Sequence, residues 1–123
     1  MGGHLERMHR LWKAGLAPDA AGRVVFLECT AKYPPSKVRE CLEELRDGGA
    51  LEGAAAVVFC DFRHAGAART EIFAFLETFA STLPCPVFRD FPYGHVPESR
   101  LIDFRREVEI SPDGTVQFKP PAP

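Results

Sequence analysis

Two short and almost continuous apolar runs restrict the fold of this chain more than any other feature. They are RVVFLEC at 23–29 and AAAVVFCDF at 54–62. Strands that are buried on both faces have this composition. The segment between them has helical spacing, and its apolar stripe consists of Val38, Cys41, Leu42 and Leu45. A strand, a helix and a strand in this order predict parallel strands joined by a right-handed crossover.

The flanking segments complete an α/β pattern. The expected elements are a helix at 4–15, a helix capped by Ser36 that ends at Gly48, a helix from Thr70 to about Leu83, and a third strand at 84–91. Alternating residues on either side of SPDG predict a hairpin within 106–118 that extends the sheet or packs beside it. We therefore predict one α/β domain over 1–118, with a mostly parallel sheet and crossover helices, followed by a loose tail at 119–123.

Composition excludes several classes of partner. Fifteen basic against seventeen acidic residues give a net charge of −2, so electrostatics offers no reason to expect nucleic acid or an anionic membrane. No run approaches the roughly 18 apolar residues of a membrane span, and the first ten residues lack the apolar stretch of a signal peptide. A cytoplasmic location is therefore the expectation.

The four cysteines are Cys29, Cys41, Cys60 and Cys85, and they form no C-x-x-C pair. Three of them lie in apolar or periodic stretches, which favours buried, reduced thiols over a disulfide framework or a zinc site. Cys60 and His64 could also form a nucleophilic pair, but a core cysteine is the better interpretation of Cys60.

Ionisable side chains gather where the predicted strands end. The first strand ends at Glu28, the second at Asp61, and the third leads to His95. Reactive groups of open parallel sheets lie at this carboxyl edge. A carboxylate next to an imidazole fixes its tautomer and lets the other ring nitrogen accept a proton. Glu28 and His95 are therefore candidate catalytic residues, although composition and spacing alone favour an ordinary strand-end residue and an ordinary loop residue.

Four segments in sequence resemble one known family. They are GGHL, VVFLE, AAVVFCDF and PVFRDFPYGH, and over residues 2–118 the chain is similar to the C-terminal domain of LD-carboxypeptidases. The family's acid lies in a motif like FLE, which falls on Glu28, and its histidine lies in a P-x-G-H motif, which falls on His95.

The resemblance implies a swivelling β/β/α-like fold and a serine hydrolase without metal or organic cofactor. Its serine comes from a separate N-terminal nucleophile domain, which is absent from this chain. The implied reaction is hydrolysis of the amide bond before a terminal D-amino acid in murein peptides, as part of cell-wall recycling; a related branch of the family cleaves peptide-nucleotide antibiotics.

The chain departs from the family pattern at several positions. Gly2-Gly3-His4 stands where the family has Gly-Gly-Asn, and Cys60 stands where a glycine is usual. A different loop, 101–105, follows the histidine. The serines of the chain are Ser36, Ser81, Ser99 and Ser111, and their settings are those of caps, turns and loops, not of a nucleophile.

Two functions follow as hypotheses. In the first, the chain is the Glu- and His-bearing half of an LD-carboxypeptidase-like hydrolase, inactive alone and dependent on a nucleophile domain in cis or in trans. In the second, it is a non-catalytic module that binds a peptide or protein through the surface that would face that domain. Such a surface should be unusually apolar if the partner is absent, whereas a stand-alone domain should have made it polar or buried it in a homodimer. The geometry of Glu28 and His95 discriminates between the two.

Overall fold

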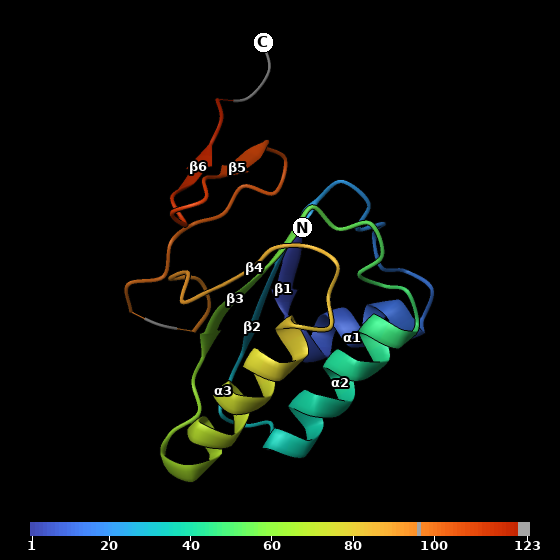
Figure 1. Cartoon of the computed structure of the whole chain (residues 1–123), viewed down its shortest axis with the longest axis vertical. Coiled ribbons are helices and arrows are strands. Elements are labelled where there is room, and N and C mark those ends of the chain that lie inside the picture. Colours follow the sequence, from blue (N-terminus) through green and yellow to red (C-terminus); the bar gives the residue numbers. More distant parts are fainter. Residues whose placement is uncertain (96, 121–123) are drawn as a thin grey trace.

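A four-stranded, fully parallel sheet forms the centre of the computed structural model, which describes residues 1–95 and 97–120. The strands lie side by side in chain order: β1 (Gly2–His4), β2 (Val24–Cys29), β3 (Ala56–Phe62) and β4 (Val87–Arg89). The helices that connect them are α1 (Leu5–Lys13), α2 (Pro35–Asp47) and α3 (Gly66–Ala80). Figure 1 shows the three helices grouped on one side of the sheet. The predicted α/β class with crossover helices is therefore confirmed.

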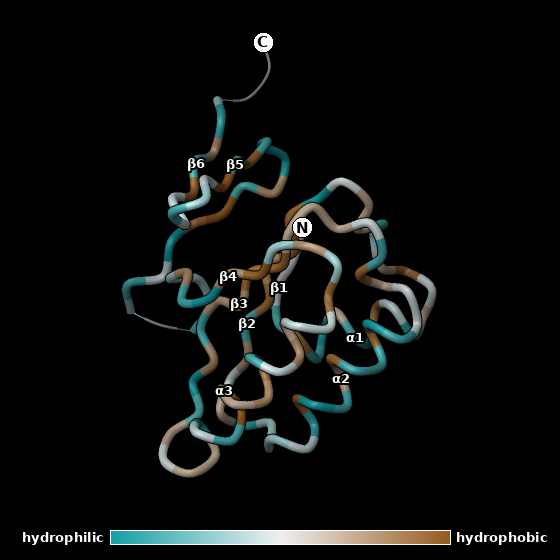
Figure 2. Tube along the Cα trace, viewed as in Figure 1, coloured by the Kyte–Doolittle hydropathy of each residue, from teal (hydrophilic) through white to brown (hydrophobic). Residues whose placement is uncertain are grey.

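The C-terminal hairpin packs beside the parallel sheet and does not extend it. Its strands β5 (Val108–Ile110) and β6 (Val116–Phe118) form a separate antiparallel pair. The face of the sheet opposite the helices packs against this hairpin, and the ring of Phe26 stacks on that of Phe118 with centroids 6.2 Å apart. Figure 2 shows hydrophobic residues along the central strands, whereas hydrophobic and hydrophilic residues alternate along the helices and the hairpin.

The two-sided packing explains why the apolar runs are continuous. All six residues of β2 are buried. Val25 and Leu27 face the helix layer, whereas Val24 and Phe26 face the hairpin layer. Each position is removed from water on one face or the other, so no polar alternation develops.

One strand was missing from the sequence-based prediction. β1 pairs with β2 over three residues, with Gly2 opposite Phe26 and His4 opposite Glu28. A Cβ at Gly2 would lie 1.9 Å from the carbonyl oxygen of Phe26, so this position accepts glycine alone. Two glycines in a three-residue strand remove the β-branched and aromatic signal by which strands are recognised, and the helix predicted at 4–15 includes His4.

Both predicted helix caps are wrong. Pro34 is the N-cap of α2 and Pro35 its first residue, a position for which the fixed φ of proline is suited, so Ser36 lies inside the helix. Helix α3 begins at Gly66, four residues before Thr70. The Thr70 hydroxyl donates to the Gly66 carbonyl inside the helix. The third strand is also shorter than predicted, since β4 covers 87–89 of the expected 84–91.

The C-terminal segment is ordered beyond the hairpin strands. The Lys119 backbone N–H donates to the Glu107 carbonyl, and its ammonium group lies 2.7 Å from the Glu107 carboxylate. Residues 121–123 of the predicted tail lie outside the described residues. No helix in the described part of the chain combines the length and the apolarity that crossing a membrane requires.

Candidate active site

Glu28 and His95 meet at the carboxyl edge of the sheet. His95 Nδ1 lies 3.2 Å from Glu28 Oε2, although 67 residues separate the two along the chain. Glu28 is the second-last residue of β2, and His95 lies in the loop that follows β4. The structure thus brings the two predicted site residues into hydrogen-bond contact, and the assignment of a catalytic role to them stays a prediction.

Glu28 is held in a largely apolar setting. It is 4% exposed and lies on the same face of β2 as Phe26. Cys60 and Tyr93 are close enough to sense its charge. Burial raises the pKa of the Cys60 thiol to about 12, with the Glu28 carboxylate adding to the rise. Burial, and then Glu28, also raises the pKa of the Tyr93 phenol. A carboxylate in such surroundings depends on its few polar partners, and His95 is the partner in hydrogen-bond contact.

The Pro-x-Gly-His motif requires glycine at position 94 for a steric reason. Gly94 has a φ of +133°, and a Cβ at this position would lie 3.1 Å from both Cβ and Oε2 of Glu28. The backbone of the loop therefore passes directly over the carboxylate. A side chain at this position would push the loop, and His95 with it, away from Glu28.

His95 is accessible from outside the molecule. Its side chain is 63% exposed, against 5% for that of Glu28. Because Nδ1 faces the carboxylate, Nε2 is the ring nitrogen left for another group. The arrangement leaves one imidazole nitrogen oriented by a buried acid and the other open to solvent, which is the geometry of a general base.

No serine in the described part of the chain is hydrogen-bonded to the ring of His95. Ser99 Oγ accepts a hydrogen bond from the Gly94 N–H at 3.1 Å and so stabilises the loop. Ser81 Oγ donates to the Thr78 carbonyl at the end of α3.

His4 is a member of the site that the sequence-based prediction missed. It ends β1 directly beside Glu28, and its ring lies edge-on to that of His95 with centroids 6.1 Å apart. The Thr30 N–H donates to His4 Nε2, while Nδ1 is buried without a hydrogen-bond partner among the described residues. Burial lowers the pKa of His4, with Arg7 and His95 contributing and Glu28 opposing. One sequence signal could have revealed His4. The triplet Gly2-Gly3-His4 precedes an amphipathic helix, and a short strand at the triplet would end with the histidine.

Cys60 and His64 do not form a nucleophilic pair. His64 Nε2 is hydrogen-bonded to the Tyr33 carbonyl, and Cys60 Sγ lies 3.7 Å from the Val58 carbonyl oxygen. With a pKa of about 12, the Cys60 thiol is not ionised at neutral pH. The interpretation as a core cysteine is confirmed by its burial, at 3% exposure. Within residues 1–95 and 97–120, no three His, Cys, Asp or Glu side chains are grouped as a metal site would require.

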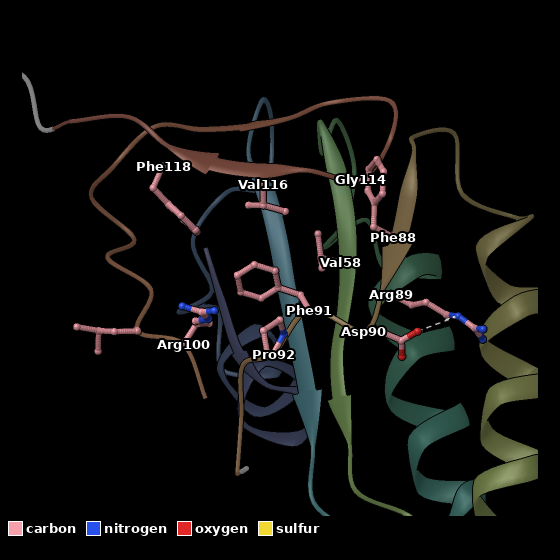
Figure 3. Close-up of a pocket in the computed structure, with 11 residues that line it drawn as sticks. Val58, Phe88, Arg89, Asp90, Phe91, Pro92, Arg100, Gly114, Val116 and Phe118 are labelled. Carbon is pink, nitrogen blue, oxygen red and sulfur yellow. Dashed lines mark ion pairs between the residues drawn. The ribbon is translucent and has the colours of Figure 1, made fainter. Parts of the chain in front are cut away.

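A pocket of about 560 Å³ lies apart from this site, between the sheet and the hairpin. Figure 3 shows Val58, Phe91, Val116 and Phe118 around it, with Arg100 at one side. Neither Glu28 nor His95 lines it. We therefore place the candidate chemistry at the edge of the sheet and not in this pocket.

Comparison with protein families gives a match over most of the chain. The family described as the LD-carboxypeptidase C-terminal domain matches residues 1–110. No curated protein matches the chain.

Two solved structures are similar in fold. A muramoyltetrapeptide carboxypeptidase from Oxalobacter formigenes superposes with a TM-score of 0.81 at 24% sequence identity, over 95% of this chain and 42% of that one. The microcin C7 self-immunity protein MccF, a point mutant in complex with adenosine monophosphate, gives a TM-score of 0.58 at 19% identity, over 75% of this chain and 28% of that one. The chain thus spans less than half the length of either structure.

Proposed function

This chain belongs to the LD-carboxypeptidase family as its C-terminal domain, and on that premise we propose that it carries the acid and the base of a serine hydrolase whose nucleophile lies on another domain. The observation that carries the proposal is the 3.2 Å contact between Glu28 Oε2 and His95 Nδ1, with the acid buried and the imidazole exposed.

The contact assigns a role to each atom. Glu28 accepts the Nδ1–H of His95, so the lone pair of the neutral ring is on Nε2. Nε2 then takes the proton of a serine hydroxyl as that oxygen attacks the scissile carbonyl, and later returns the proton to the leaving amine. The buried carboxylate stabilises the imidazolium that forms between these steps, and water hydrolyses the acyl-enzyme.

The nucleophile must come from outside the described part of the chain. The two structures similar in fold are more than twice as long as this chain, which leaves room for a nucleophile domain in cis or in trans. From the name of the first structure we infer the substrate class: murein tetrapeptides that end in a D-amino acid. The resemblance found in the sequence supports extending the proposal to cell-wall recycling in the cytoplasm.

Reconstitution tests the proposal. The protein is assayed alone and together with the nucleophile domain of a muramoyltetrapeptide carboxypeptidase, and release of D-alanine from a muramoyl tetrapeptide is measured. The chain alone should release none, whereas the pair should be active. Glu28→Gln should lower kcat by about 10⁴-fold and His95→Gln by about 10⁶-fold, as in serine peptidase triads.

A second His–Glu pair in the chain provides the control. His9 Nε2 lies 2.7 Å from Glu44 Oε2, between α1 and α2 and away from the carboxyl edge. His9→Gln breaks this pair and should leave activity unchanged in folded protein. Full activity of the reconstituted His95→Gln variant, or hydrolysis by the chain alone, would refute the assignment.

One observation favours the alternative of a binding module. Leu101 is 96% exposed and Phe104 42% exposed, in the loop that follows His95. Apolar side chains at the surface of this loop are what a partner-binding surface would present. If the nucleophile domain binds the chain but the complex releases no D-alanine, the module hypothesis is the one to keep.

A further inference from the structure

Arg63 connects three separate segments at the edge of the sheet. It lies directly after β3, and its backbone N–H donates to the Cys29 carbonyl at the end of β2, at 3.0 Å. Its guanidinium Nη1 donates to the backbone carbonyl of His95. Its Nε lies 3.9 Å from Asp61 Oδ2. Its side chain is 43% exposed, so exposure alone does not reveal this role.

We propose that Arg63 is a positioning residue that holds His95 in contact with Glu28. The functional meaning of this inference rests on the proposed role of His95 as the base, but the contact itself and its test do not.

The loop around His95 needs such an anchor. Gly94 has a backbone conformation that few residues other than glycine adopt. Because glycine is the most flexible residue in an unfolded chain, ordering the loop at this position costs more conformational entropy than it would with another residue. The other hydrogen bonds of the loop hold the residues before His95: the Asp61 N–H donates to the Tyr93 carbonyl, and Gly94 is bonded to Ser99. The Arg63 contact falls on His95 itself. It fixes the backbone from which the imidazole extends, and therefore the distance from Nδ1 to the carboxylate.

The chemistry of arginine suits this task. A hydrogen bond from a charged donor is stronger than one between neutral groups. The planar guanidinium also presents several donors in a fixed geometry, so one group can face a carboxylate and a carbonyl together. Lysine, with a compact ammonium on a flexible stem, would hold the same carbonyl less firmly.

Asp61 orients Arg63. Oδ2 of Asp61 is buried and makes no hydrogen bond to the described residues, and the guanidinium of Arg63 is the cation within 4 Å of it. The carboxylate therefore favours the side-chain conformation in which Arg63 extends toward His95. This arrangement gives Asp61 a supporting role in the site.

Nuclear magnetic resonance of the ¹⁵N-labelled chain tests the proposal without substrate or nucleophile domain. The spectra are recorded at pH 8, above the reference pKa of about 6.5 for free histidine, and the ¹⁵N shifts of His95 report which ring nitrogen carries the proton. In the native protein the Nδ1–H tautomer should dominate because Glu28 accepts that proton. Arg63→Met should reduce the ratio of Nδ1–H to Nε2–H tautomer about fivefold and raise amide exchange at Gly94 by a similar factor, as expected for one typical hydrogen bond. Arg63→Lys should recover part of both effects.

Arg39→Met is the matched control. Arg39 lies on α2, is 49% exposed and pairs with Glu43, so the variant removes an equal charge of similar exposure far from the loop. It should leave the His95 tautomer and the Gly94 exchange rate unchanged. Native tautomer ratios in folded Arg63→Met would overturn the proposal, as would an equal change in Arg39→Met.

A second variant covers the case in which Arg63→Met does not fold. Asp61→Asn leaves Arg63 in place but removes the charge that orients it, and should shift the His95 tautomer in the same direction by about twofold, as a weak exposed ion pair allows. No shift in Asp61→Asn would then count against the proposal. None of these measurements involves hydrolysis. A failed reconstitution would therefore refute the proposed function without affecting the role of Arg63, and a native His95 tautomer in Arg63→Met would refute the role of Arg63 without affecting the proposed function.

Discussion

Replacement of Gly94 by alanine should separate His95 from Glu28 and destabilise the fold more than an equivalent change elsewhere. The added Cβ would lie 3.1 Å from both Cβ and Oε2 of Glu28, well inside the 3.5–4.0 Å at which carbon atoms pack best. Glu28 is buried in the central strand β2, so it cannot move aside easily. The loop must therefore yield.

Gly3 provides a control with a matched backbone. Its φ is +151°, close to the +133° of Gly94, but a Cβ at Gly3 meets no atom within 4 Å. Both alanine variants carry the strain of an unfavourable backbone region, about 1–3 kcal/mol. Gly94→Ala alone adds the cost of overpacking, about 1–3 kcal/mol.

The difference between the two variants is therefore the measured quantity. At roughly 3–6 °C per kcal/mol for a domain of this size, Gly94→Ala should lower Tm further than Gly3→Ala by about 3–18 °C, as followed by circular dichroism. If the added Cβ displaces only the loop and leaves the rest of the fold intact, the loss of Tm is smaller and the population of the His95 Nδ1–H tautomer falls instead. Equal Tm losses together with a native His95 tautomer in Gly94→Ala would refute the steric reasoning.

Three further results are expected. In the native protein, a thiol reagent at pH 8 should modify Cys85, which is partly exposed, well before Cys29 and Cys60, whose burial raises each thiol pKa to about 12; equal rates would contradict this. The native protein should lose stability between pH 7.5 and 5, because the folded-state pKa of His4 lies below 6.5 and the unfolded chain therefore binds a proton at His4 first as the pH falls. His4→Asn should reduce this loss of unfolding free energy, measured by urea titration at each pH. An unchanged pH profile would contradict the reasoning. Gly2→Ala should prevent β1 from pairing, since its Cβ would lie 1.9 Å from a carbonyl oxygen of β2, and a Tm equal to that of the native protein would show otherwise.

The α/β fold was predictable because burial leaves a direct record in composition. β2 and β3 read as continuous apolar runs since both of their faces are covered, and the stripe of α2 matched its buried residues. The helix starts were not predictable in the same way. A cap contributes only about 1 kcal/mol, and at Ser36 and Thr70 the neighbouring proline and alanine residues decided where the helix begins.

The site was predictable in part. The rule that parallel strands end at one edge located Glu28, Asp61 and His95. It could not locate His4, because a strand of two glycines and a histidine carries no strand signal. It also could not distinguish Arg63 from other exposed arginines, because its function depends on a carbonyl 32 residues away.

By itself, then, the sequence determined the order of the helices and of strands β2 to β4, the burial of the sheet on both faces and the presence of an acid at the end of a strand. These properties follow from the local pattern of apolar and polar residues. The tertiary structure alone decided that Nδ1 of His95 lies 3.2 Å from Oε2 of Glu28, because that distance depends on sheet register, on the bare backbone of Gly94 and on the reach of Arg63. A local sequence pattern cannot specify a contact between residues that are far apart in the sequence and meet only when the chain folds.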